Sequence, residues 1–270
     1  MTINTMSTNK HIAMWSCPRS RSTLITRSFE QLDGCMIFDE PLYAPYLLKH
    51  AFDHPEREAV MAHRETDPQK VIQQITSDLP EGVSFSFQKQ MAKHLLPDYD
   101  INWIKSLTNF FLIRNPKQII LSYNKVCQKV TKNDIGMEDL YNLFKKVESF
   151  TGKTPLVIDS TDLIKNPQGF LEVICSKIGI NFSEQMLSWE PGFKTRKKNL
   201  KSPFPYLKSP FPWLWTGELP PTVWYSNINQ STGFRPYQEK EINFPDELMP
   251  VLEDCLPFYG KLYQYRLTID

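Results

Sequence analysis

The chain has 270 residues, of which 41% are hydrophobic and 13% aromatic, so it can bury a large core in a single α/β domain. Its 31 basic and 30 acidic residues leave a formal net charge of +1, which excludes the strongly basic surface of a nucleic-acid-binding protein and a general attraction to anionic membranes. An anionic ligand must therefore be held by a local cluster of cations.

The cysteines and the N-terminus bear on the cellular compartment. The five cysteines are odd in number and no two have metal-ligand spacing, so we expect reduced thiols. The N-terminus lacks the apolar stretch of a secretory signal, and no apolar run approaches the ~20 residues of a membrane-spanning helix. We therefore expect a cytoplasmic protein without a transmembrane segment.

Short apolar runs alternate with helical patterns along residues 12–179. The runs are nearly continuous, as in parallel strands covered on both faces, and lie at Ile12–Ser16, Cys35–Phe38, Val83–Phe87, Asn109–Ile113 and Leu156–Ile158. Amphipathic helices follow the first and fourth runs, and a third is marked by Asn166 as N-cap, Pro167 at its first position and Gly179 at its end. This alternation predicts an α/β fold of three α/β/α layers, with a central parallel sheet of about five strands.

The composition changes after residue 190. A basic run from Lys194 to Lys201 is followed by Lys-Ser-Pro-Phe-Pro at 201–205 and again at 208–212. The prolines argue against regular structure, and the aromatic content is too high for a disordered linker. We expect a single domain over residues 1–270, in which residues 191–237 form an ordered loop that covers the active site. A C-terminal helix is expected within Asp246–Tyr265.

The segment from Cys17 to Thr23 connects the first predicted strand to the first predicted helix. A turn into a helix N-terminus exposes unpaired N–H groups at the positive end of the helix dipole, and this arrangement binds phosphate. The side chains add charged and hydroxyl donors, at Arg19, Ser20, Arg21, Ser22 and Thr23. The alternative is an N-cap serine beside two solvated arginines.

The segment is not a Walker A loop, because it lacks the G-x-x-x-x-G-K-[ST] pattern. The fourth predicted strand ends in Arg114, where a P-loop ATPase commonly carries a magnesium-binding acid. An arginine there would repel a metal ion and can bind a phosphate through two hydrogen bonds. These features favour a nucleotide held by cations in a site without a metal.

Together these segments resemble the cofactor-binding elements of the sulfotransferase superfamily. Pro18-Arg19-Ser20-Arg21-Ser22-Thr23 is similar to that family's loop for the 5′-phosphosulfate of 3′-phosphoadenosine 5′-phosphosulfate. The stretch from Arg114 to Tyr123 resembles the family's 3′-phosphate element, and this match implies 3′-phosphate contacts by Arg114 and Ser122.

A third stretch supports the resemblance. Asp159 through Leu163, then Asn166-Pro167, then a segment ending at Ile180, resembles the family's Tyr-Glu-Asp-Leu…Asn-Pro…Leu-Gly-Leu segment. The resemblance covers roughly residues 11–190, is nearest to bacterial and plant sulfotransferase-like proteins, and implies a fold like that of P-loop-containing nucleotide hydrolases.

The sequence departs from the animal cytosolic sulfotransferases in two places. Arg21 replaces a glycine, so we expect no positive φ at this position. Their cofactor-covering Arg-Lys-Gly…Gly motif is missing. By resemblance to bacterial and plant proteins, its role falls on Ser231, Thr232, Gly233, Phe234 and Arg235. The alternative there is an ordinary glycine turn.

The resemblance implies in-line attack of an acceptor hydroxyl on sulfur, with adenosine 3′,5′-bisphosphate as the product and without a metal. Positioning and charge stabilisation should then account for most of the rate. Arg19 is the natural cation for the bridging oxygen, where negative charge develops, and Ser22 and Thr23 would hold the oxygens of the 5′-phosphate.

Two residues are candidates for the general base. Glu40 follows the second predicted strand, where some bacterial sulfotransferases place a glutamate base, although its neighbour Asp39 could be the inward residue. His94 follows the third strand, roughly where the animal enzymes carry a catalytic histidine, but its spacing from the strand is longer than theirs. The alternative for Glu40 is a carboxylate that only caps a helix, and the alternative for His94 is a histidine on the surface. Lys89 is a further residue that could point into the site.

Two other functions remain open. One is a small-molecule kinase related to P-loop enzymes, which magnesium dependence would reveal. The other is a non-catalytic nucleotide-binding or partner-binding protein. The repeated proline-rich segment favours it, because such segments can dock to partner domains. For the sulfotransferase, we expect a small-molecule or carrier-bound hydroxyl acceptor and no nucleic-acid partner. The pattern predicts no oligomeric state.

Overall fold

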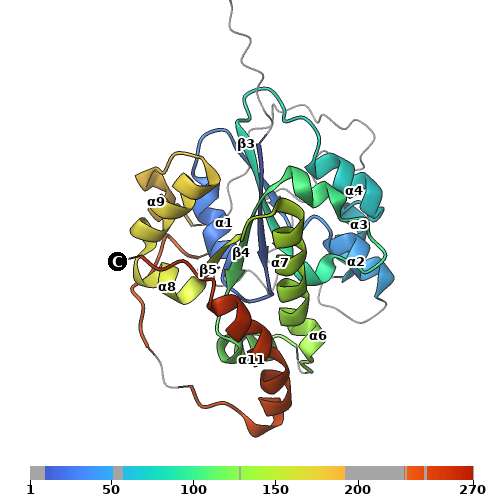
Figure 1. Cartoon of the computed structure of the whole chain (residues 1–270), viewed down its shortest axis with the longest axis vertical. Helices are drawn as coiled ribbons and strands as arrows, with labels where there is room; N and C mark the ends of the chain where they lie inside the picture. The colour runs from blue at the N-terminus through green and yellow to red at the C-terminus, as the bar shows by residue number, and fades with distance from the viewer. Residues whose placement is uncertain are drawn as a thin grey trace, which may run out of the picture.

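The computed structural model describes residues 10–50, 57–127, 129–191, 228, 230–239 and 242–269. Within these residues, five parallel strands form one sheet in the order β2-β3-β1-β4-β5 (Figure 1). The strands are β1 (Lys10–Ser16), β2 (Cys35–Asp39), β3 (Phe85–Met91), β4 (Thr108–Ile113) and β5 (Leu156–Asp159). The sheet confirms the predicted α/β class with a central parallel sheet of five strands.

Helices cover both faces of the sheet and make three layers (Figure 1). One face packs against α1 (Ser22–Glu30), α8 (Ser160–Lys165) and α9 (Pro167–Ile178). The other packs against α4 (Pro68–Ile75), α5 (Pro116–Asn124), α7 (Met137–Thr151) and α11 (Met249–Tyr263). The remaining helices are shorter: α2 (Tyr43–Lys49), α3 (Arg57–His63), α6 (Lys132–Ile135) and the 3₁₀ turns η1 (Ala92–His94), η2 (Asn102–Ser106), η3 (Glu184–Leu187) and η4 (Asp246–Leu248).

The central strand β1 divides its side chains between the two layers. Ile12 and Met14 pack on the α1 and α9 side, whereas Ala13 and Trp15 pack on the α5 and α7 side, and all four are fully buried. A strand with helices on both faces must be apolar at every position, which explains the nearly continuous apolar runs.

The predicted third strand, Val83–Phe87, is wrong at both ends, because β3 runs from Phe85 to Met91. The polar residues that seemed to end the strand are buried in it. Gln88 Nε2 donates to the carbonyl of Ile75 at 2.7 Å, and Lys89 forms ion pairs in the same layer. The sequence does not show these partners, which belong to other elements. The polar residues therefore looked like the end of the strand, although the strand continues through them.

The predicted helix signals are confirmed. The Asn166 side chain accepts a hydrogen bond from the Gly169 N–H at 3.1 Å, and Gly179 ends α9 with φ 70°. The C-terminal helix is α11, which contains Pro257 within its length. Most of the expected 191–237 loop, including the basic run and both proline-rich copies, lies outside the described residues.

Replacing Phe87 by alanine should lower the free energy of unfolding by about 3–5 kcal/mol, since it opens a cavity at the centre of the sheet. Phe87 is fully buried, and its ring stacks on that of Phe29 with centroids 4.0 Å apart. Urea unfolding measures the change. Leu48→Ala is the control, because Leu48 is 55% exposed and its loss should change stability by less than about 0.5 kcal/mol. A loss below about 1 kcal/mol for Phe87→Ala would contradict this packing.

Candidate functional site

The predicted site residues of the first half of the chain follow the carboxyl ends of four strands. Arg19 follows β1, Glu40 follows β2, His94 follows β3 and Arg114 follows β4. All strands are parallel, so these residues share one edge of the sheet. The fold therefore brings together residues that are separated by up to 95 positions in the sequence.

Hydrogen bonds join the two predicted phosphate elements. Arg114 Nη1 donates to the carbonyl of Arg19 at 2.6 Å, and Arg114 Nε donates to Gln118 Oε1 at 2.9 Å. Arg19 Nε donates to the Ser122 hydroxyl at 3.0 Å. The loop after β1 is thus tied to β4 and α5, which is where the sequence placed the 5′- and 3′-phosphate contacts.

Three arginines, Arg19, Arg21 and Arg114, form what we call the arginine cluster. Burial and the charges of Arg21 and Arg19 lower the pKa of Arg114 to about 9. Burial likewise lowers the pKa of Arg21, against the nearby Tyr237 and Asp159, which raise it. Like charges this close repel one another, so an anion bound between them would be favoured.

Several polar atoms beside the cluster lack hydrogen-bond partners among the described residues. They are Ser20 Oγ, Arg21 Nη1 and Ser160 Oγ. Ser20 is fully buried and Ser160 is 1% exposed. Buried polar atoms without partners destabilise a fold, so their presence indicates a ligand that supplies the missing bonds. Phosphate oxygens accept hydrogen bonds from hydroxyl and guanidinium donors, so these residues fit a phosphorylated ligand.

The turns that follow β1 and β2 have strained backbones. Among the described residues, the non-glycine residues with positive φ are Arg19 at 61°, Arg21 at 71° and Glu40 at 49°. The expectation that Arg21 would avoid positive φ is wrong. Arg21 is the N-cap of α1, and the short turn from β1 requires a left-handed residue there despite its side chain. Strain of this kind, about 1–3 kcal/mol per residue, is typical of functional sites.

Ser22 and Thr23 are the first residues of α1, and no side-chain hydrogen bond caps this helix. Ser22 is 4% exposed, and its carbonyl accepts a hydrogen bond from the Thr26 hydroxyl at 2.9 Å. The N-terminus of α1 therefore directly follows Arg21, in the turn where the sequence places the 5′-phosphate contacts.

Glu40 lies in a buried ion-pair network. Lys89 Nζ is 2.8 Å from Asp39 Oδ1 and 2.8 Å from Glu40 Oε1. Arg64 Nη1 donates to the carbonyls of Asp39 and Glu40 at 3.1 and 3.2 Å. Burial acts to raise the pKa of Glu40, but the charges of Lys89, Arg64 and Lys93 outweigh it and lower the pKa. Glu40 is therefore ionised at neutral pH.

His94 is buried rather than on the surface, with 2% exposure in η1. Its ring stacks on Tyr43, with centroids 5.2 Å apart, and lies 4.7 Å from the Tyr46 centroid. Because β3 ends at Met91, His94 follows the strand by three positions, so the long spacing inferred from the sequence disappears.

Lys93 is a site residue that the sequence reading missed. Its ammonium donates to the carbonyl of Asp134 at 3.1 Å and lies over the rings of Tyr46 and Tyr123. Burial lowers the pKa of Lys93, and the charges of Asp134 and Glu40 oppose this. The sequence around Lys93 contains no pattern that distinguishes a buried lysine from a solvated one.

The Ser231–Arg235 segment packs on residues 187–189. Trp189 N donates to the carbonyl of Thr232 at 3.0 Å, and Trp189 Nε1 donates to the Ser231 hydroxyl at 3.0 Å. Gly233, with φ 153°, lies so close that a Cβ there would be 2.7 Å from the Leu187 carbonyl oxygen. These contacts hold Ser231, Thr232 and Gly233 against that stretch.

The rest of the segment leads toward the arginine cluster. The Phe234 ring meets Trp189 edge-on at 5.6 Å, and Arg235 is exposed. Tyr237, two residues beyond this segment, lies near enough to Arg21 and Arg114 to affect their pKa values. The structure therefore brings Tyr237, which was not predicted, close to the cluster.

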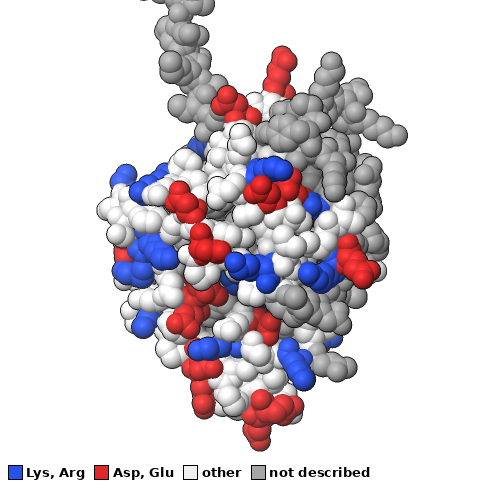
Figure 2. Space-filling model, turned by 90° about the vertical axis from the view of Figure 1, so that its right-hand side faces the viewer, with Lys and Arg blue, Asp and Glu red and all other residues white. Residues whose placement is uncertain are grey.

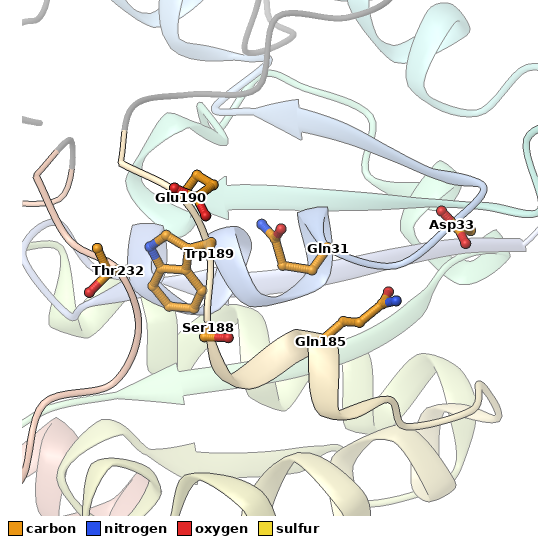
Figure 3. A pocket seen from close by; sticks show the side chains of 7 residues that line it. All are labelled: Gln31, Asp33, Gln185, Ser188, Trp189, Glu190 and Thr232. Atoms are coloured by element: carbon orange, nitrogen blue, oxygen red, sulfur yellow. The ribbon is translucent and has the colours of Figure 1, made fainter.

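An open pocket of ≈ 670 Å³ lies beside this segment (Figure 3). Its lining includes Gln31, Gln185, Trp189 and Thr232. Gln31 is the C-cap of α1, whereas Arg19 and Arg21 precede the first residue of that helix. The pocket is therefore separate from the arginine cluster.

On the face in Figure 2, the Lys and Arg side chains of the described residues are interspersed with those of Asp and Glu. In the part of the chain that the structure describes, no helix is long and apolar enough to cross a bilayer. No three His, Cys, Asp or Glu side chains gather as metal ligands in those same residues.

A family model described as a sulfotransferase domain matches residues 10–200. The branched-chain-amino-acid aminotransferase-like protein 2 of Arabidopsis thaliana is 31% identical over 251 residues, which are 93% of this chain and 41% of that protein. The chain therefore spans less than half the length of this relative.

Two solved structures resemble the chain at low identity. The sulfotransferase domain of the Synechococcus PCC 7002 olefin synthase is 17% identical, with a TM-score of 0.47 and 96% of both chains covered. The sulfotransferase domain from the curacin biosynthetic pathway is 13% identical, with a TM-score of 0.49, and the match covers 96% of this chain and 99% of that one. Both scores are below 0.5, so the fold assignment rests on the sheet itself.

Lys89→Met should lower the free energy of unfolding at pH 7 by about 3–5 kcal/mol, because it leaves two buried carboxylates without their cation. The folded-state pKa of Glu40 lies below its ordinary value, so Glu40 contributes stability at neutral pH that is lost as the pH falls. The difference between wild type and variant should therefore shrink at acid pH.

Urea unfolding at pH 7 and pH 4 measures this difference. Lys49→Met is the control, since Lys49 pairs with Asp98 at 3.1 Å on the surface and its loss should leave the midpoint unchanged. If the Lys89→Met variant is as stable as wild type at pH 7, the ion pairs of Lys89 with Asp39 and Glu40 do not stabilise the protein in solution.

Proposed function

We propose that this chain, which belongs to the sulfotransferase family, transfers the sulfuryl group of 3′-phosphoadenosine 5′-phosphosulfate to a hydroxyl acceptor by in-line displacement without a metal ion. The observation that carries the proposal is the arginine cluster with its partnerless buried donors, at Ser20, Arg21 and Ser160. Guanidinium and hydroxyl donors are suited to phosphate groups, and three arginines in one place disfavour magnesium.

The phosphate-binding roles follow the contacts within the site. Arg114 and Ser122 would bind the 3′-phosphate, and both already contact Arg19. Ser22 and Thr23, at the N-terminus of α1, would hold the 5′-phosphate together with Ser20 and Arg21. When bound, the cofactor supplies an activated sulfuryl group. Arg19 would stabilise the negative charge that develops on the bridging oxygen.

Glu40 is the proposed general base. The neighbouring Lys89 ammonium keeps its carboxylate ionised, so it can accept the proton of the acceptor hydroxyl. His94 is the second candidate, supported by its buried position against Tyr43 and Tyr46. These two rings also support an acceptor with an apolar or planar part, either a small molecule or a carrier-bound hydroxyl compound.

We also propose that the protein works in a reducing, cytoplasmic environment. All five cysteines are free, and three of them, Cys17, Cys175 and Cys255, are buried. Unpaired cysteines of this kind are usual where thiols are kept reduced.

Adenosine 3′,5′-bisphosphate should raise the melting temperature without magnesium, because it binds the folded state alone. At ~100 times its Kd the gain is about 2.7 kcal/mol. Differential scanning fluorimetry checks this, with ATP plus magnesium and the Arg114→Ala variant in parallel. Stabilisation should be absent from the variant. A shift with ATP and magnesium alone would favour the kinase instead, and no shift with either ligand would favour a protein that binds no nucleotide.

Glu40→Gln should lower kcat by about 10²–10⁴-fold while leaving the affinity for the bisphosphate nearly unchanged, because it removes a base but no phosphate contact. Release of the bisphosphate from the cofactor, in the presence of a mixture of hydroxyl compounds, measures turnover. His94→Ala is tested alongside it. The base is wrongly assigned if both variants retain wild-type kcat.

A further inference from the structure

A carboxylate lies beside the arginine cluster. Asp159 ends β5 and pairs in register with Ile113, so its backbone lies next to Arg114 at the same edge of the sheet. It is 2% exposed. Its charge acts on Arg21 and Arg114, yet no ion pair joins it to either of them within the described residues.

The Asp159 carboxylate is held by other donors. Oδ1 accepts the Thr161 N–H at 2.7 Å, which makes Asp159 the N-cap of α8. Oδ2 accepts the hydroxyl of Tyr259, from α11, at 3.0 Å. Donors from α8 and α11 therefore hold both carboxylate oxygens in place. Because they are held there, the negative charge stays close to the cluster without contacting a guanidinium.

Burial raises the pKa of Asp159, and the bonds from Thr161 and Tyr259 oppose that rise. A buried carboxylate close to an anion site weakens anion binding through charge repulsion, which is stronger where water is excluded. Three arginines without such a carboxylate would hold a multiply charged phosphate product tightly, and product release limits the turnover of many enzymes.

We infer that Asp159 limits the affinity of the arginine cluster for phosphate groups, and so allows the bisphosphate product to leave after each turnover. The inference rests on the proposed function for the identity of the product. Its electrostatic part applies to any phosphate-like anion that binds the cluster.

The test is isothermal titration of the full chain with adenosine 3′,5′-bisphosphate and, separately, with inorganic pyrophosphate. Two variants remove the charge, Asp159→Asn and Asp159→Ser. Asparagine and serine are both good N-cap residues, so α8 keeps its cap in each. Both anions should bind at least about fivefold more tightly to the variants. Stopped-flow dissociation of the bisphosphate should slow by a similar factor.

Asp67→Asn is the matched control. Asp67 is the N-cap of α4, where its Oδ1 accepts the Gln69 N–H at 2.9 Å. The same chemical change is made there at a helix on the β2 side of the sheet. This variant should bind both anions as wild type does.

Unchanged or weaker binding of both anions in both Asp159 variants would overturn the inference. Weaker binding of the bisphosphate in particular would mean that Asp159 accepts a hydrogen bond from it. If wild type binds only pyrophosphate, and the variants bind it more tightly, the inference stands and the proposed cofactor is wrong. If neither wild type nor the variants bind either anion, both the inference and the proposed function fail.

Discussion

Mutual repulsion among three partly buried arginines is the constraint around which this site is arranged. Arg114 is held against the Arg19 carbonyl, and its pKa falls to about 9 because burial and the neighbouring cations disfavour its charge. A chain keeps such charges together only when rigid elements fix their backbones, and here parallel strands do so. An anion at this position relieves the repulsion, so the fold itself prepares the affinity for phosphate.

The same edge of the sheet carries a second charged group with the opposite balance. At the ends of β2 and β3, Lys89 lies 2.8 Å from the carboxylates of both Asp39 and Glu40, so the positive charge there is matched by carboxylates. The excess of cations beyond β1 and β4 is suited to binding a phosphate, whereas a fixed carboxylate is suited to accepting the proton of a hydroxyl group. The proposed sulfuryl transfer needs both environments side by side, and one parallel sheet supplies them.

The sequence predicted helices and strands well where the signal was local. Apolar runs located the strands, and Asn166 with Gly179 located the ends of α9, because caps and periodicity act within a few residues. It failed where the deciding partner was distant. The strand β3 was placed too early because its polar residues are satisfied by contacts with Ile75 and Asp39. The positive φ of Arg21 was missed because turn geometry overrode residue preference.

By itself the sequence determined the α/β class, the loop after β1, the arginine after β4 and, with the match over residues 10–200, the family. Only the tertiary structure decided which charges meet. Asp159 lies in a motif that did not place it beside the arginine cluster, and neither Tyr237 near that cluster nor Lys93 near Glu40 carries a motif. Electrostatic interactions depend on distance and burial, which sequence spacing does not record, whereas backbone propensity and hydrophobic period are written along the chain.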